Sequence, residues 1–312
     1  MLCKILRYFP YTLGKENKFS FLSLCMQNKL KVAIIGTGNI GSDLLLKIQK
    51  SAVLECGLFT GRNLESEGIK RAQELGVPTS ADSIAAIERD PSCCEIVFDA
   101  TSAQNHLVHA PILKQLGKFV IDLTPSRIGT MCIPVLNIDK ALSAQNVNLV
   151  TCGGQACVPL AKVIMDTHPD TTYIEIVGSI ASKSAGSGTR ANIEEYMLTT
   201  KRALEQFSGV QKAKVILVFN PAEPPVLMHN TIYASIPNPN IELLKEKIDK
   251  MAELIRGYVP GYQVTYGPIV EKGRVAITVQ VVGSGDFLPA YAGNLDIITC
   301  AAVRVAEDYA KT

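Results

Sequence analysis

The stretch KVAIIGTGNIG at residues 31–41 decides the fold, because an apolar strand runs directly into a glycine-rich turn that opens a helix. In this G-x-G-x-x-G pattern Gly36 permits the tight turn, Gly38 lets the backbone approach a pyrophosphate, and Gly41 lets the helix pack on the strand. The amino end of the helix then faces the anion. The stretch predicts the first unit of a dinucleotide-binding sheet; the alternative is an ordinary strand-to-helix turn.

Apolar strands and helices continue to alternate through the first half of the chain. Strands are expected at residues 53–59, 95–100 and 118–123, and helices at residues 43–50, 64–75, 83–89 and 105–116. Buried strands separated by helices are typical of a doubly wound parallel sheet of the Rossmann type, whose ligands bind at the carboxyl ends of the strands. We therefore expect an α/β fold whose crevice contains the glycine turn, Thr101, Ser102 and Thr124.

The second expected strand ends without the acidic residue that commonly binds the ribose 2′-hydroxyl of NAD. The sequence there reads Thr60, Gly61, Arg62, Asn63. An arginine at this place can accept the 2′-phosphate of NADP, although Arg62 is equally compatible with a solvated loop. The choice between NAD and NADP therefore stays open on these residues.

A cysteine lies near the midpoint of the chain, where this alternation ends. Residues 147–151 suggest an arriving strand and residues 155–166 have helical spacing, so Cys152 is expected on a strand-to-helix turn. Backbone N–H groups and the helix dipole favour a thiolate there, and Gly153 and Gly154 let the backbone approach a reacting carbonyl. A buried structural cysteine is the alternative. The glycine turn upstream and a second glycine-rich loop downstream favour the nucleophile.

The second half of the chain has the pattern of a catalytic domain. Strands are expected at residues 173–177, 213–219, 231–235, 264–266 and 275–282, and helices from about residue 192, at 241–256 and up to 309. The β-branched runs and glycine-containing turns favour a mixed or antiparallel sheet with an apolar face for burial or dimerisation. The small residues and hydroxyls around Lys183 and Arg190 indicate an anion- or cofactor-facing loop, or a flexible one.

Composition limits the class of protein further. The chain has 312 residues, of which 47% are hydrophobic and 19% charged, which indicates a globular protein of two domains. A net charge of +2 without a long basic run argues against nucleic acid or a membrane surface as partner. Nine cysteines without regular spacing fit reduced thiols in the cytoplasm. Residues 1–28 are basic and broken in hydropathy, and are expected to lie outside the fold.

Two histidines one helical turn apart are a weaker candidate site. His106 and His109 have a spacing that can share a metal ion, but no third ligand is evident nearby in the sequence. The pattern therefore favours a solvated helix face, and no metal site is predicted.

Several longer motifs occur in a specific order. They are KVAIIGTGNIG (31–41), VFDATSA (97–103), IDLTPS (121–126), NVNLVTCGGQA (146–156), SKSAGSGTRANI (182–193), NPAEPP (220–225) and LPAYAGNLDI (288–297). Through them the chain from Met26 onward resembles the acetylating acetaldehyde dehydrogenases. Members of that family form acyl-CoA and are partners of 4-hydroxy-2-oxovalerate aldolase in the catabolism of aromatic compounds. The resemblance implies a short aliphatic aldehyde and coenzyme A as substrates, NAD as cofactor, a homodimer and an aldolase partner.

The resemblance also implies roles for particular residues. Cys152 would form an acyl thioester, and Thr37, Gly38, Asn39 and Ile40 would hold the pyrophosphate. The nicotinamide site would be lined by Lys183, Ser184, Ala185, Gly186, Ser187, Gly188, Thr189, Arg190, Ala191 and Asn294. The family pattern has an aspartate shortly after NPAEPP as acid/base, where this chain has His229 and Asn230. His229 is therefore a candidate base.

The predicted organisation has four parts. Residues 1–28 form an extension, 29–150 the dinucleotide-binding domain, 151–290 a catalytic and dimerisation domain, and 291–312 a helix that returns to the first domain. The leading hypothesis is an acylating aldehyde dehydrogenase that uses coenzyme A. The alternatives are a phosphorylating semialdehyde dehydrogenase with the same domain plan and a catalytically silent NAD-binding subunit of an aldolase complex.

Overall fold

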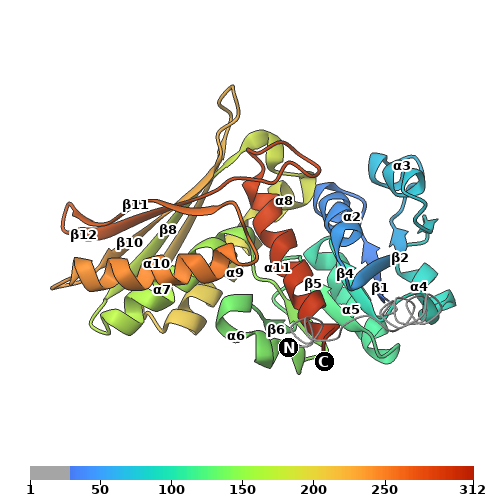
Figure 1. Cartoon of the computed structure of the whole chain (residues 1–312), viewed down its shortest axis with the longest axis horizontal. Coiled ribbons are helices and arrows are strands. Elements are labelled where there is room, and N and C mark those ends of the chain that lie inside the picture. The colour runs from blue at the N-terminus through green and yellow to red at the C-terminus, as the bar shows by residue number, and fades with distance from the viewer. Residues whose placement is uncertain (1–28) are drawn as a thin grey trace, which may run out of the picture.

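The computed structural model of the protein describes residues 29–312, which contain two sheets with a long helix between them (Figure 1). The extension predicted at residues 1–28 lies outside the described residues. No helix of the described part is long and apolar enough to cross a membrane.

The first sheet is parallel throughout, as the sequence predicts. Its seven strands lie in the order β3-β2-β1-β4-β5-β7-β6. They are β1 (Leu30–Ile35), β2 (Leu54–Thr60), β3 (Thr79–Ser80), β4 (Ile96–Asp99), β5 (Phe119–Asp122), β6 (Thr130–Met131) and β7 (Asn146–Asn148). The two-residue strands β3 and β6 were not predicted, because two residues carry no periodic pattern.

Helices cover both faces of this sheet, and the alternation of side chains along β1 explains how. Val32 and Ile34 pack in one core with Leu44, whereas Ala33 and Ile35 point to the opposite core. The helices are α2 (Asn39–Lys50), α3 (Glu67–Glu74), α4 (Ile84–Arg89), α5 (Ala103–Gln115) and α6 (Pro134–Leu142). Burial on both faces accounts for the near-continuous apolar strands that the sequence contains.

The second sheet is mixed, with the order β11-β12-β10-β8-β9, and only β8 and β9 run parallel. Its strands are β8 (Tyr173–Ala181), β9 (Ala213–Asn220), β10 (Met228–Ser235), β11 (Tyr262–Glu271) and β12 (Arg274–Val281). Its helices are α7 (Cys152–Thr167), α8 (Ser187–Ala191), α9 (Ile193–Ser208) and α10 (Ile241–Arg256). Figure 1 shows α7, α9 and α10 along one face of this sheet.

Helix α11 (Gly293–Tyr309) lies between the two sheets and packs against α2 and α7 (Figure 1). An ion cluster fixes it to α2. The ammonium group of Lys47 lies 2.9 Å from Asp43, 3.1 Å from Asp286 and 2.6 Å from Asp296. The three carboxylates are close enough to hold a metal ion, but the Lys47 ammonium already occupies the space among them, within 3.1 Å of each. The cluster therefore explains how the end of the chain is held on the first sheet.

Candidate active site

Cys152 is the first residue of α7 and follows the end of β7 by a short turn. The turn is built by its neighbours. Val150 has a left-handed φ of 62°, which is unusual for a β-branched residue and redirects the chain. The Thr151 hydroxyl then caps the helix by accepting the Gly154 N–H at 2.9 Å. The strand-to-helix turn predicted from the sequence is confirmed, and the thiol lies half-buried at its tip.

Tyr196 of α9 is the side chain that touches this thiol. Its hydroxyl lies 3.3 Å from the Sγ atom of Cys152 and accepts the N–H of Gly153 at 2.8 Å. A Cβ added to Gly153 would lie 2.4 Å from the same hydroxyl, so this position must be glycine for the contact to form. Tyr196 could not be predicted from the sequence, because only the packing of two helices brings residue 196 to residue 152.

The electrostatics of the thiol differ from the expectation. Burial raises the pKa of Cys152 above its ordinary value, and the hydrogen bonds from the Tyr196 hydroxyl and the Gly153 amide lower it only in part. Two amide groups of the turn are also occupied, Gly153 N–H by Tyr196 and Gly154 N–H by Thr151. The expectation that free amides activate the thiol is therefore wrong for Gly154, whose N–H the Thr151 hydroxyl already binds, whereas the Gly153 N–H lowers the pKa of the thiol although Tyr196 also accepts it.

The glycine turn at the start of α2 has the geometry that its motif predicts. Gly36 has a φ of 115°, and an added Cβ would lie 2.5 Å from the carbonyl oxygen of Ala100. An added Cβ at Gly41 would lie 1.8 Å from the carbonyl oxygen of Gly36, so the helix packs directly on the turn. Gly38 is different, since its Cβ would meet nothing within 4 Å. No side chain caps α2, so its first amides are not taken by a side chain of the protein.

One cavity of about 480 Å³ contains both turns. The predicted site residues that line it are Gly36, Thr37, Gly38, Asn39, Ile40, Cys152, Ser184, Gly186, Thr189 and Asn294. Thr101, Ser102 and Thr124 also line it, as predicted from their position at the carboxyl ends of the parallel strands. Of all its described lining residues only Arg62 carries a charge. A thiol beside a dinucleotide-type turn can combine covalent capture of a carbonyl group with hydride transfer.

Four of the other predicted residues of the second glycine-rich loop do not line this cavity. They are Lys183, Ala185, Arg190 and Ala191. Ser187 and Gly188 lie outside the part of the chain whose side chains the structure describes. The Lys183 ammonium is exposed and pairs with Glu223 at 2.6 Å. Arg190 donates hydrogen bonds to the carbonyl oxygens of Ala185 and Ser182, at 3.1 and 2.6 Å. Both basic side chains thus hold the loop in place and do not face the cavity.

His229 also lies away from the cavity. It is the second residue of β10, on which Met228, Asn230 and Ile232 are buried against the helices and His229 alternates to the opposite, partly exposed face. Its Nδ1 atom is 3.2 Å from the carbonyl oxygen of Leu227. Asn230 does point inward and is 1% exposed, but it does not line the cavity either.

Two buried polar atoms of the cavity wall lack a partner among the described residues. They are the Oδ1 atom of Asn294 and the hydroxyl of Thr124, whose residues are 7% and 3% exposed. Buried polar groups in proteins are normally hydrogen-bonded, so these two positions indicate a polar ligand. With the uncapped amides of α2 and the space beside Gly38, they fit a nicotinamide dinucleotide.

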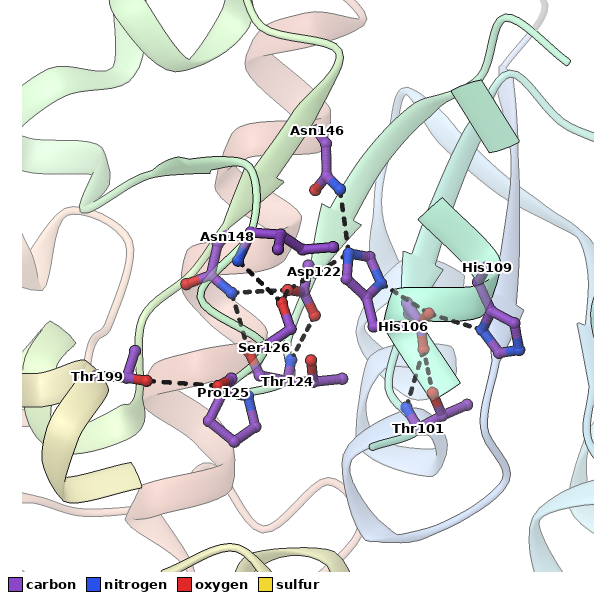
Figure 2. Close-up of polar contacts among 12 residues, drawn as sticks. Thr101, His106, His109, Asp122, Thr124, Pro125, Ser126, Asn146, Asn148 and Thr199 are labelled. Carbon is purple, nitrogen blue, oxygen red and sulfur yellow. Dashed lines mark hydrogen bonds and ion pairs between the residues drawn. The ribbon is translucent and has the colours of Figure 1, made fainter. Parts of the chain in front are cut away.

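A network of buried polar side chains connects to the cavity-lining residues Thr101 and Thr124 (Figure 2). His106 and His109 each direct Nδ1 at the same Asp99 oxygen, at 2.9 and 2.8 Å. Nε2 of His106 lies 3.5 Å from Asp122 and 3.1 Å from Asn146. The two histidines are 0% and 6% exposed, so the solvated helix face expected from the sequence is wrong. Both histidines face the sheet because the Asp99 carboxylate gives them a buried partner.

The same network shapes the loops that form the cavity floor. Asp99 accepts hydrogen bonds from the backbone and hydroxyl of Thr101, and Asp122 accepts the N–H of Thr124 at 2.7 Å. Burial raises the pKa of Asp99, but the hydrogen bonds of the two histidines outweigh it and hold that pKa well below its usual range. Burial lowers the pKa of His106, but Asp99 and Asp122 raise it by more, so the net shift is upward. Asp99 and Asp122 thus favour the charged form of the His106 ring, and the ring connects the two carboxyl groups that hold the floor loops.

Comparison with known proteins places these features in a family. The family described as "Prokaryotic acetaldehyde dehydrogenase, dimerisation" matches residues 152–289. An acetaldehyde dehydrogenase of Pectobacterium atrosepticum is 52% identical over 284 residues, which cover 90% of this chain and 96% of the relative. One of Spirochaeta aurantia is 53% identical over 282 residues, covering 90% and 95%.

A solved structure supports the fold. It is the crystal structure of aspartate semialdehyde dehydrogenase II of Vibrio cholerae, with a TM-score of 0.57 and 16% identity. The match covers 90% of this chain and 100% of that chain. At this identity the likeness concerns the fold alone.

Proposed function

This chain belongs to the acetaldehyde dehydrogenase family, and from that premise we propose that it oxidises acetaldehyde or another short aliphatic aldehyde to an acyl-CoA. Cys152 is the proposed nucleophile. The observation that carries the proposal is that a thiol and an uncapped, glycine-rich helix start line one cavity. The first can capture an aldehyde and the second can bind a dinucleotide.

In the proposed reaction the Cys152 thiolate attacks the aldehyde carbon. A carbon–sulfur bond forms and the carbonyl electron pair moves to oxygen, beside the N–H of Cys152 at the first position of α7. The turn at the start of α2 and Asn294 would hold a nicotinamide dinucleotide, which would supply a hydride acceptor beside that carbon and a positive charge that favours the Cys152 thiolate. The acyl thioester on Cys152 is then attacked by the thiol of coenzyme A, which releases acyl-CoA and the Cys152 sulfur.

For the dinucleotide we propose NAD, held by the turn at Thr37, Gly38, Asn39 and Ile40 and by Asn294. Arg62 keeps NADP as the alternative cofactor, because it lines the cavity just after β2 and no described lining residue is acidic. Initial rates with NAD and NADP in parallel test this choice. If Arg62 binds a 2′-phosphate, Arg62→Ala will lower kcat/KM for NADP about tenfold and leave that for NAD unchanged.

The assay that tests the function supplies acetaldehyde and NAD with coenzyme A, with phosphate, or with neither, and follows formation of NADH. We expect turnover with coenzyme A only. Turnover with phosphate alone would instead identify a phosphorylating semialdehyde dehydrogenase. Failure with every acceptor, together with no acyl adduct on Cys152, would identify a catalytically silent subunit.

A matched pair of variants tests the nucleophile. Cys152→Ala removes the thiol at the tip of the turn, and we expect at least about a thousandfold loss of turnover. Cys157→Ala changes a cysteine on the same helix that is fully buried and does not line the cavity, so it should keep turnover within a few-fold. Retained turnover in Cys152→Ala would refute the mechanism.

We also propose that the chain forms a homodimer in the cytoplasm and that an aldolase is its partner. The printed description of the matched family names dimerisation. The second sheet has helices along one face, and its edge strands expose Val218, Tyr266 and Val270 to solvent in the single chain, which supports an interface there. All seven described cysteines are free thiols, as expected in a reducing compartment. Sedimentation velocity and co-purification with 4-hydroxy-2-oxovalerate aldolase test the two assemblies.

A further inference from the structure

One face of α9 contacts the turn at Cys152 at two points and the loop after β5 at a third. Tyr196 contacts Cys152 and Gly153, Thr199 donates to the carbonyl oxygen of Pro125 at 3.4 Å, and Thr200 lies 2.7 Å from the hydroxyl of Thr151. Residues at i, i+3 and i+4 share one side of a helix. Figure 2 shows the Thr199 contact, where the second domain reaches the floor loop of the first. Helix α9 is thus positioned by the loops of the first sheet.

Backbone groups at both ends fix the direction of the threonine hydrogen bonds. The Thr200 hydroxyl donates to the carbonyl oxygen of Tyr196 at 2.8 Å, so in its pair with Thr151 it must accept. The Thr151 hydroxyl donates to Thr200 and accepts from the Gly154 N–H. Each of the two threonine hydroxyls therefore has a fixed donor and acceptor role. Together they connect the carbonyl group of Tyr196 in α9 to the Thr151 cap of α7.

The direction of the tyrosine hydrogen bond follows by the same reasoning. An N–H can only donate, so the Tyr196 oxygen accepts from Gly153 at 2.8 Å. The hydroxyl proton of Tyr196 is then available to Cys152, and Sγ at 3.3 Å is its one described partner. The Gly153 amide thus holds the Tyr196 oxygen in place, and the Tyr196 O–H group is directed at the Cys152 sulfur.

We propose that Tyr196 is a catalytic residue whose hydroxyl donates a hydrogen bond to the Cys152 sulfur and so stabilises its thiolate. The inference rests on the proposed function, in which Cys152 is the nucleophile. The hydrogen bond is strongest when sulfur is negative, which is the case before attack on the aldehyde and again when coenzyme A displaces the sulfur. Tyr196 keeps its proton throughout, since burial raises the pKa of the Tyr196 hydroxyl well above its ordinary value.

The pH dependence of Cys152 alkylation tests the proposal without requiring turnover. The rate of modification by iodoacetamide is measured on the full chain, and the Cys152 peptide is quantified by mass spectrometry. Alkylation requires the thiolate, so Tyr196→Phe should shift the alkylation profile to higher pH by about one unit. At neutral pH the rate should fall about tenfold. An unchanged profile in Tyr196→Phe would overturn the proposal.

Tyr258→Phe is the matched control. The hydroxyl of Tyr258 is buried and has no hydrogen-bond partner among the described residues, so its loss should leave the alkylation profile of Cys152 unchanged. A shift as large as that of Tyr196→Phe would show that a buried tyrosine hydroxyl affects the thiol only through general packing. That result would also overturn the proposal.

Gly153→Ala provides a second, independent change. Its Cβ would lie 2.4 Å from the Tyr196 hydroxyl and would push it away while the tyrosine stays in the sequence. The alkylation profile should shift in the same direction as in Tyr196→Phe, and an unshifted profile would contradict the role of the hydroxyl. If wild-type protein shows the predicted thiol profile but no turnover with coenzyme A, the proposed function fails while the inference on Tyr196 stands.

Discussion

Helices α2 and α7 begin at the same edge of the same parallel sheet, α2 after β1 and α7 after β7, yet their first turns are opposite in chemistry. Gly38 at the start of α2 offers no side-chain cap. Thr151 caps α7 by accepting the Gly154 N–H, and Tyr196 accepts the preceding amide, that of Gly153. The first helix start is therefore open for an anion, whereas the second is closed by the protein and presents a thiol.

The difference teaches that a helix amino end becomes a binding site only where the protein leaves its amides unoccupied. The two turns also bend the chain differently. At the open turn Gly36 has a φ of 115°, outside the range of other residues, whereas Val150 at the closed turn has a φ of 62°, inside the left-handed region. The open turn before α2 thus requires glycine at position 36. The closed turn before α7 is held by hydrogen bonds to the side chains of Thr151 and Tyr196.

The largest expected effect is at the open turn. In Gly36→Ala the new Cβ would meet the carbonyl oxygen of Ala100 at 2.5 Å in a backbone conformation that alanine avoids. We expect the free energy of unfolding to fall by about 3 kcal/mol, measured by urea unfolding. Gly38→Ala is the control, since its Cβ would meet nothing within 4 Å. Equal losses in both variants would contradict the distinction between these glycines.

A second change makes the open turn resemble the closed one. Gly38 has extended backbone angles, so Gly38→Ser can place a hydroxyl where Thr151 has one, and this hydroxyl would compete for the amides of α2. We expect the dissociation constant of NAD to rise about tenfold, roughly 1.4 kcal/mol, without loss of stability. Calorimetric titration measures it. Gly38→Ala adds a Cβ without the oxygen, so an equal effect there would assign the loss to steric contact.

The third change opens the closed turn. Thr151→Ala removes the cap of Gly154 N–H and leaves Thr200 without a donor. The expected loss is about 1 kcal/mol in unfolding free energy, with unchanged affinity for NAD. Thr151→Ser keeps the hydroxyl and should retain most of the stability. If serine and alanine destabilise equally, the hydroxyl does not act as a cap.

The smallest effect concerns the network that connects the two turns through β4, β5 and β7. The pKa of His106 is raised in the folded state, so its contribution to stability is complete below the unfolded value of about 6.5 and is lost as pH rises through the folded value. Asp99 keeps its bonds to Thr101 and His109, which limits the loss. Denaturation at several pH values should show a decline in wild type that is absent in His106→Asn. Parallel pH profiles would contradict this role.

Much of the fold can be predicted from the sequence, because its signals are local. The apolar run before Gly36 and the glycine spacing define β1 and α2, and the alternation of strand and helix predicts the parallel sheet and its crevice. The cysteine turn is equally local, since β-branched residues, Cys152 and two glycines are adjacent in the chain. Family resemblance adds Asn294, which lies far away in sequence but lines the same cavity.

What the sequence does not predict depends on contacts between distant elements or on strand phase. The Tyr196 hydroxyl reaches Cys152 only because α9 packs on α7. The burial of His106 depends on Asp99 of a neighbouring strand. For His229 a signal was available, since apolar Met228, Ile232 and Ala234 share one face of β10 and an odd-numbered neighbour must lie on the other.

The most direct test of the account is to isolate the acyl enzyme. The full chain is incubated with acetaldehyde and NAD in the absence of coenzyme A, quenched in acid and digested, and its peptides are weighed by mass spectrometry. The account predicts one acetyl group on the peptide that contains Cys152, which disappears when coenzyme A is added before the quench. Formation of NADH with no acyl group on Cys152, or with the group on another residue, would contradict it.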